Sequence, residues 1–270
     1  MVDITETRGF VSHESILLTH GVPTRRVFLL LHGLTASPLQ FDAFGRLLFA
    51  RGSNVLIPRL PRHGLADRLT TELEHLTAGE LKSFASASLA EARLLGEAVT
   101  VVGFSVGGLL AAWLGQCEGI ERATAIAPFL GVSWIPQALM ANATRLTLAM
   151  PNQFWWWNPI ARERMLPAHG YPRFATHAVA QAAHLAAELL SAAETRKPAA
   201  RHLAIVLNAS ESTVSNPAAR RLARAWAARR PDRIVLHRLR GLPLSHDIIE
   251  PLGSTIATSL YPKLIDLVDP

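Results

Sequence analysis

The fold is decided by the stretch Thr100-Val101-Val102-Gly103-Phe104-Ser105-Val106-Gly107-Gly108. A short apolar run leads into Gly-x-Ser-x-Gly, and further apolar residues follow at 109–114. The run predicts a buried strand and the residues after it predict a helix, so the serine lies on a tight turn between them. This context is the one that a nucleophile elbow requires, in which a serine hydroxyl points out from the edge of a sheet. The pattern makes Ser105 a candidate nucleophile.

The glycines of the motif have a geometric reason. A side chain at Gly103 or Gly107 would collide with its surroundings as the helix and the strand close on each other, and Ser105 itself has to adopt a strained backbone conformation. The alternative interpretation is a glycine-rich turn with an incidental serine. The strand and helix that frame the motif argue against it.

Strands and helices alternate on both sides of this motif. Strands are expected at 15–19, 27–31, 54–58, 100–103, 123–127, 202–207 and 234–239, and helices at 39–50, 78–95, after Ser105, at 217–229 and after Pro251. Such alternation predicts an α/β fold, with a mostly parallel sheet, right-handed crossovers and helices on both faces.

One segment departs from the alternation. Between residues 129 and 200 no strand is expected, only helical pieces broken by prolines. Aromatic residues gather there: Trp134, Phe154, Trp155, Trp156, Trp157 and Phe174. The segment is too short for an independent core, so we expect a single domain over residues 1–270 with 129–200 as a helical cap over the carboxyl edge of the sheet, lining the pocket. Since a helix turns consecutive residues to different sides, at least one of the three adjacent tryptophans faces the pocket or solvent.

Composition narrows the class of protein. The chain has 270 residues, of which 49 % are hydrophobic, enough for a large core. Residues 1–6 do not have the basic-then-apolar pattern of a signal peptide, and apolar runs such as the one at 27–31 are far too short to span a bilayer. A single cysteine, Cys117, excludes an internal disulfide. We therefore expect a cytoplasmic protein without an integral membrane segment; no feature indicates an oligomeric state.

The chain is basic, with a net charge of +6 and a pI of about 10.4. Arginines cluster only near residues 220–230, on a helix that also carries Leu222 and Trp226. This arrangement is typical of a solvated helix face. Because no nucleic-acid-binding motif accompanies the cluster, we expect no nucleic-acid partner.

A serine is a weak nucleophile at neutral pH, so Ser105 needs a base. In a parallel sheet the functional residues lie on loops at the carboxyl ends of strands, and in this elbow the order along the chain is serine, acid, histidine. His246, just beyond the last expected strand, fits that order, whereas His32 and His63 precede the serine.

The base in turn needs an acid that orients it. Glu211 is the only carboxylate between the strand at 203–207 and the helix at 217, and glutamate is an accepted variant in this role. Asp247 is the alternative, although a residue adjacent to His246 tends to point away from it.

Two backbone amides are expected to form an oxyanion hole. The amide of Val106, at the start of the elbow helix, is one donor, and the second comes from the loop after the strand at 27–31. Gly33 lets that loop turn so that the amide of Leu34 can face the site. Each such donor contributes about a hundred- to a thousand-fold in rate.

The chain resembles the α/β-hydrolase superfamily, and within it the bacterial carboxylesterases and monoacylglycerol-lipase-like enzymes. The resemblance rests on four segments: His32-Gly33-Leu34-Thr35-Ala36-Ser37-Pro38, Pro58-Arg59-Leu60-Pro61-Arg62-His63-Gly64, Gly103-Phe104-Ser105-Val106-Gly107-Gly108 and Ser245-His246-Asp247. It implies a catalytic serine, histidine and acid, two backbone donors, a cap in the aromatic-rich insertion and no cofactor or metal. The chain departs from the family at the acid, where Glu211 stands in place of the usual aspartate.

The sequence thus predicts a serine hydrolase, a carboxylesterase acting on a small or medium ester with an apolar acyl or aromatic group. Thioester hydrolysis, acyl transfer and carbon–carbon bond hydrolysis use the same three residues and stay open. A non-catalytic, ligand-binding member of the fold is a further alternative, against which the intact serine, histidine and oxyanion loop argue.

Overall fold

The structure, a computed structural model, describes residues 13–164, 167–244, 246–251 and 255–269. Residues 1–6, on which the expectation of no signal peptide depends, lie outside the described residues, as does Ser245 of the last family motif.

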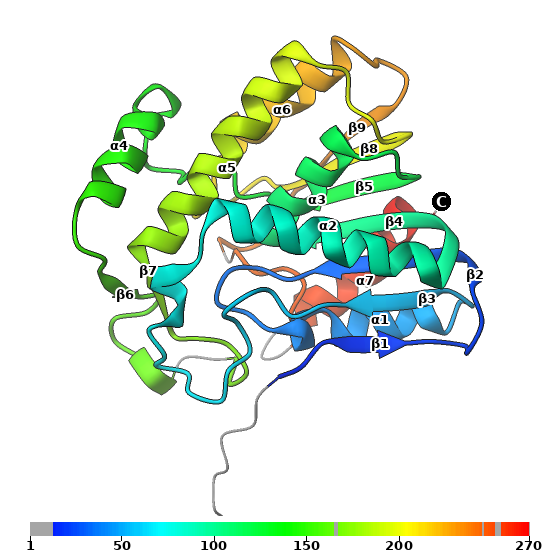
Figure 1. Ribbon diagram of the computed structural model, residues 1–270, viewed down its shortest axis with the longest axis horizontal. Coiled ribbons are helices and arrows are strands. Elements are labelled where there is room, and N and C mark those ends of the chain that lie inside the picture. Colours follow the sequence, from blue (N-terminus) through cyan, green and yellow to red (C-terminus); the bar gives the residue numbers. More distant parts are fainter. Residues whose placement is uncertain (1–12, 165–166, 245, 252–254, 270) are drawn as a thin grey trace, which may run out of the picture.

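A seven-stranded sheet forms the centre of the molecule, in the order β1-β3-β2-β4-β5-β8-β9 (Figure 1). Only β1 runs antiparallel to its neighbour; every other pair is parallel. The strands are β1 (Ile16–Leu18), β2 (Thr24–Leu31), β3 (Asn54–Ile57), β4 (Gly96–Phe104), β5 (Arg122–Ile126), β8 (His202–Asn208) and β9 (Ile234–Leu239). The expected α/β fold is confirmed, with every predicted strand in place.

Helices cover both faces of this sheet (Figure 1). Four lie in front of it in the view: α2 (Ala78–Leu95), α3 (Val106–Cys117), α5 (Thr176–Thr195) and α6 (Asn216–Ala227). Behind it lie α1 (Asp42–Phe49) and α7 (Thr255–Val268), in contact through the rings of Phe44 and Tyr261. Because the strands between these layers are covered on both sides, the run at 27–31 is completely buried.

Local sequence signals set the helix ends. Thr77 and Glu80 form a capping box at the start of α2: the threonine hydroxyl accepts the Glu80 amide, and the glutamate accepts the Thr77 amide. Ser215 accepts the Ala218 amide at the start of α6. On α6, Arg221 and Arg224 are exposed while Leu222 and Trp226 are buried, as expected of a solvated face.

The segment 129–200 differs from the expectation of helices alone. It contains α4 (Gln137–Ala149), a short 3-10 helix (Arg162–Arg164) and the helix α5, but also two strands, β6 (Phe154–Trp156) and β7 (Arg173–Ala175). These strands pair antiparallel, with Trp155 opposite Phe174. The expectation of no strand here was wrong because aromatic residues favour strands, and the partner strand lies too far along the chain for a local pattern to reveal it.

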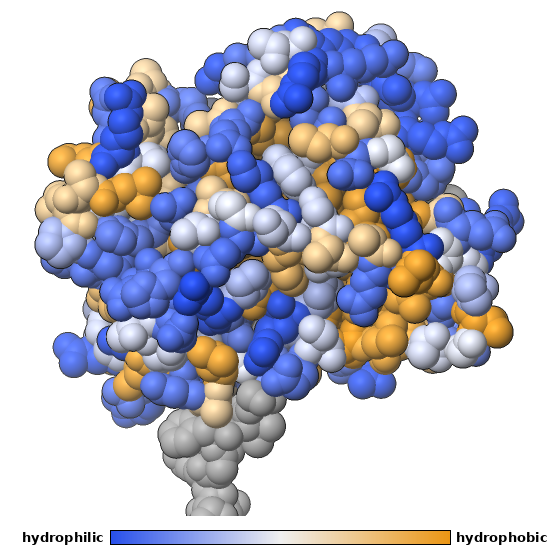
Figure 2. Space-filling view, in the orientation of Figure 1, coloured by the Kyte–Doolittle hydropathy of each residue, from blue (hydrophilic) through white to orange (hydrophobic). Residues whose placement is uncertain are grey.

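The outer surface of this segment carries apolar side chains. Leu139, Leu146 and Met150 of α4 and its C-terminal end are exposed, and Figure 2 shows orange side chains at the left of the molecule, over α4. Within the described part of the chain, no helix combines the length and apolar character needed to span a bilayer.

Candidate active site

The elbow lies where β4 passes into α3, at the middle of the sheet. Ser105 has a φ of +55° and a ψ of −114°, the strained conformation expected of this turn. A Cβ on Gly103 would lie 1.9 Å from the Gly107 carbonyl oxygen, and one on Gly107 would lie 1.9 Å from the Leu31 oxygen. No side chain fits at either position, so the glycines are required by the close approach of β2, β4 and α3.

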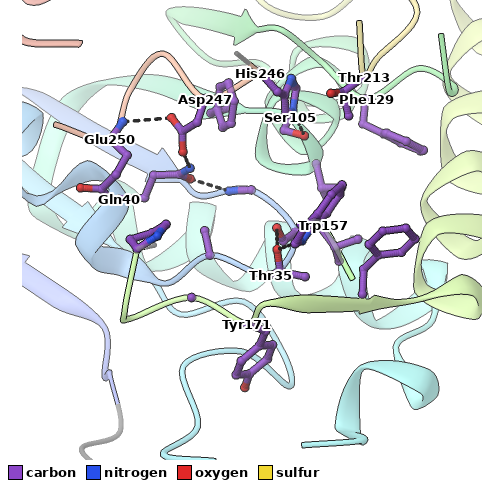
Figure 3. Close-up of a pocket in the computed structure, with 18 of the residues that line it drawn as sticks. Thr35, Gln40, Ser105, Phe129, Trp157, Tyr171, Thr213, His246, Asp247 and Glu250 are labelled. Carbon is purple, nitrogen blue, oxygen red and sulfur yellow. Dashed lines mark hydrogen bonds between the residues drawn. The ribbon is translucent and has the colours of Figure 1, made fainter. Parts of the chain in front are cut away.

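Ser105, His246 and Glu211 form a hydrogen-bonded chain. The Ser105 Oγ lies 2.8 Å from His246 Nε2, and His246 Nδ1 lies 2.8 Å from Glu211 Oε2. Since a carboxylate only accepts hydrogen bonds, the ring proton belongs on Nδ1, and the lone pair of Nε2 faces the serine hydroxyl. Figure 3 shows the His246 ring directed at Ser105. In this arrangement His246 Nε2 can accept the proton of the Ser105 hydroxyl.

The Glu211 carboxylate is buried and well supplied with donors. Its Oε1 accepts the amides of Thr213 at 2.6 Å and Val214 at 3.3 Å. Burial raises the pKa of this carboxyl, but the hydrogen bond and charge of His246 and the two amides outweigh it, and the pKa lies below its usual range. The group is therefore ionised at neutral pH and can stabilise a positive charge on the imidazole.

Asp247, the alternative acid, is directed toward a different partner. Its Oδ2 accepts a hydrogen bond from Gln40 Nε2 at 2.6 Å, and its Oδ1 accepts the amides of Ile249 and Glu250, each at 2.9 Å. In Figure 3 its carboxylate extends toward Gln40, away from Ser105.

The loop after β2 lies against the serine. A Cβ on Gly33 would lie 3.5 Å from the Cβ of Ser105, and both Leu34 and Val106 line the cavity next to it. The next residue, Thr35, has a φ of +66°, unusual for a β-branched residue. The positions of Gly33 and Leu34 are those that an oxyanion loop would occupy.

Three residues from outside this loop form hydrogen bonds with Thr35. Its amide donates to His63 Nε2 at 3.1 Å, and its carbonyl accepts the Tyr171 amide at 2.7 Å. The indole of Trp157 donates to its hydroxyl at 2.8 Å (Figure 3). Two of the three partners belong to the segment 129–200, so this segment supports the loop directly.

His32 and His63 are buried and support the loops after β2 and β3. The Nδ1 of each lies within 2.9 Å of a carbonyl oxygen, of Gly33 and Pro61 respectively, and each Nε2 accepts a backbone amide. Burial lowers the pKa of His63 to about 4. Burial also lowers the pKa of His32 well below its usual value, and the neighbouring His63 ring disfavours a second positive charge beside it. Both rings are neutral, and each joins the loop after β2 to the loop after β3.

A cavity of about 480 Å³ opens in front of Ser105. One end is polar and includes Gln40, Asp247 and Glu250; the serine and histidine lie between the two ends (Figure 3). The other end is apolar and includes Phe129 and Trp157 (Figure 3), with Phe174 in ring contact with Trp157. Val132 and Val179, also of the segment 129–200, line the cavity as well. The cavity suits a ligand with one apolar arm.

Sequence reasoning missed Thr35, Gln40, Trp157 and Tyr171 as individual contributors to the site. Thr35 lies within the family motif at 32–38 and Gln40 follows it by two residues, and this motif was the one local signal near them. Within the described residues, no group of three or more His, Cys, Asp or Glu side chains is arranged to hold a metal ion.

Comparison with known proteins extends these observations. No curated protein matches the sequence. Among solved structures, the monoacylglycerol lipase of Paleococcus ferrophilus superposes with a TM-score of 0.72 at 18% identity, covering 94% of this chain and 97% of that one. A soluble variant of the monoglyceride lipase of Saccharomyces cerevisiae gives 0.69 at 14% identity, over 99% and 96% of the two chains.

A thioesterase domain from the curacin biosynthetic pathway also shares the fold, with a TM-score of 0.57 at 13% identity over 93% and 94% of the chains. At such identities these similarities establish the fold. The family model described as the alpha/beta hydrolase family matches residues 28–249, which include the elbow, the loop after β2 and His246. The chain belongs to the alpha/beta hydrolase family.

Proposed function

We propose that this protein is a serine carboxylesterase that acts on esters with a small or medium apolar acyl or aromatic group. The observation that carries the proposal is the chain of two 2.8 Å contacts from Ser105 through His246 to Glu211, on a strained elbow at the floor of the cavity. The lipases among the similar structures support ester chemistry.

In this proposal Ser105 Oγ attacks the ester carbonyl carbon while His246 Nε2 takes its proton. The carbonyl oxygen gains the negative charge and accepts hydrogen bonds from the amides of Leu34 and Val106. The tetrahedral intermediate collapses, His246 returns the proton to the leaving alcohol, and an acyl-enzyme remains on Ser105. Water then attacks the acyl carbon by the same route, and the acid leaves.

The segment 129–200 acts as the cap of this site. Its residues Trp157, Phe174 and Val179 line the apolar end of the cavity, which we assign to the acyl group. The polar end then receives the alcohol. No cofactor takes part in the reaction, and the cytoplasmic location expected from the sequence stays a prediction.

The test combines a probe with a substrate series. A fluorophosphonate should label the protein, and peptide mapping should place the adduct on Ser105. Nitrophenyl esters from acetate to dodecanoate should show a maximum in kcat/KM at a small or medium chain, and matched thioesters should react more slowly. An unlabelled protein that hydrolyses none of these esters would refute the proposal, and faster thioester cleavage would change its substrate class.

A further inference from the structure

Gln40 connects two loops of the candidate site. Its side chain is almost completely buried, with a residue exposure of 3%. The Oε1 accepts the Gly33 amide at 2.8 Å, and the Nε2 donates to Asp247 Oδ2 at 2.6 Å. Figure 3 shows this bridge, with Gln40 between Asp247 and the loop after β2.

The bridge has a fixed direction. A backbone amide can only donate and a carboxylate can only accept, so each partner of Gln40 is matched by the opposite end of its side-chain amide. Rotating that amide by a half turn would place two donors against each other at Gly33 and two acceptors against each other at Asp247. Leaving these buried donors and acceptors without partners would cost the free energy of the lost hydrogen bonds.

The two partners are neighbours of the groups that handle the substrate in the proposed reaction. Gly33 precedes Leu34, whose amide would bind the oxyanion, and Asp247 follows His246, which would move the proton. These two groups act on the same carbonyl, so the distance between their loops has to stay fixed during the reaction. A displacement of about 1 Å in such a geometry can cost about a hundred-fold in rate.

We propose that Gln40 is a positioning residue, which sets the oxyanion loop against the loop of His246 through Gly33 and Asp247. The proposal rests on the proposed ester hydrolysis. It assigns Asp247 a part as well: this carboxylate holds Gln40 in place and does not orient the imidazole.

The test exchanges the donor and the acceptor of the hydrogen bond between residues 40 and 247. In D247N an amide donor faces the donor of Gln40, and kcat should fall by about ten- to a hundred-fold with a nearly unchanged KM. In the double variant Q40E/D247N, the carboxylate introduced at position 40 accepts both the Gly33 amide and the new amide donor at position 247. This variant also keeps the net charge of the natural chain, and its kcat should return to within about three-fold of the starting value.

The single variant Q40E adds a readout that a merely structural role would not move. Two carboxylates then face each other, one of them takes up a proton, and the shared proton restores the lost donor. The ratio of its kcat to that of the natural protein should therefore fall as the pH rises from about 6 to about 8. Gln153→Glu, which adds the same charge at an exposed position outside the cavity lining, should leave that ratio flat.

A variant of similar length, Gln40→Met, removes both hydrogen bonds without burying a charge and keeps the test valid if a charged variant does not fold. It should lose activity like D247N while remaining folded by circular dichroism. Wild-type kcat in both Gln40→Met and D247N, or a double variant no faster than D247N, would overturn the proposal. Failure of the proposed function has a different result, namely that the natural protein itself neither reacts with fluorophosphonate nor cleaves esters.

Discussion

In the described part of the protein, two sets of serine, histidine and glutamate side chains are joined by hydrogen bonds, each forming a short hydrogen-bonded chain. The two chains have the same residue types and similar contact distances. In the site chain, Ser105–His246–Glu211, both contacts are 2.8 Å. In the buried chain, Ser37–His169–Glu250, the serine hydroxyl lies 2.9 Å from Nδ1 and the glutamate 2.8 Å from Nε2 of the histidine. Hydrogen bonding alone therefore does not distinguish them.

The surroundings of the two serines distinguish the two chains. Ser105 has a positive φ at a strand–helix turn and lines the cavity, next to the amide of Val106. Ser37 is completely inaccessible and has an extended backbone, with a φ of −138°, before a 3-10 helix (Pro38–Phe41). A nucleophile needs access to a substrate, and of these two serines only Ser105 lines the cavity.

The buried chain joins three segments that are far apart in the sequence: the loop after β2, the segment 129–200 and the loop of His246. We expect these contacts to hold the three segments together. The comparison predicts that a serine-to-alanine substitution lowers activity at Ser105 and stability at Ser37.

The largest effect should come from Ser105→Ala. Loss of the nucleophile should lower kcat by about a million-fold, the scale seen when such a residue is removed from a catalytic unit. Steady-state ester hydrolysis and fluorophosphonate labelling measure the loss. Ser37→Ala is the matched control and should keep labelling and kcat within a few-fold; a comparable loss in both variants would contradict the distinction between the chains.

The next effect concerns Glu211. Changing it to glutamine keeps the size of the side chain but removes the acceptor that fixes the proton on Nδ1 of His246, and kcat should fall by up to about ten-thousand-fold. Glu211→Asp keeps the charge and withdraws it by one methylene, so its loss should be smaller. If both variants retain most of their activity, another carboxylate orients the imidazole.

Ser37→Ala should instead affect stability. The substitution leaves the buried Nδ1 of His169 without its hydroxyl partner, and the free energy of unfolding should decrease by about 1–3 kcal/mol. Urea denaturation followed by circular dichroism measures this change. An unchanged midpoint would show that the buried chain does not hold its segments together.

The last prediction is a pH dependence of stability. His63 has a pKa of about 4 in the folded protein, below the ordinary value of 6.5, so between these values the unfolded chain binds more protons. The free energy of unfolding should therefore rise with pH across this interval, reach its full value above about 6.5, and be lost as the pH falls toward about 4. Urea denaturation of His63→Gln should show a weaker pH dependence; an unchanged slope would assign the effect to other groups.

Periodicity and turn residues were sufficient to predict the main sheet and its helices. Residues 78–95 form α2 with the expected bounds because a capping box and a regular apolar spacing are local signals. The pair β6 and β7 was missed because Trp155 and Phe174 meet across nearly twenty residues, and no local pattern specifies such a partner.

The candidate site was predictable to the extent that chain order and strand ends determine it. The rule that functional residues follow strand ends selected His246 and Glu211. His246 contacts Ser105 and Glu211 contacts His246, and their catalytic roles stay predictions. The roles of Gln40 and of the buried chain were not predicted, because the role of a buried polar side chain depends on partners that lie far away in the sequence. Gln40 and Asp247, for example, are 207 residues apart.

The hydrogen bonds of Thr35 matter for any attempt to exchange segments between members of this family. Exchange of the segment 129–200 would remove the Tyr171 amide and the Trp157 indole, two hydrogen-bond donors to Thr35, which has a φ of +66°. A chimaera could then keep every residue of the site chain and still lose the shape of the loop next to Ser105. The segment 129–200 and the loop after β2 should therefore be transferred together, and a successful graft has to supply both donors.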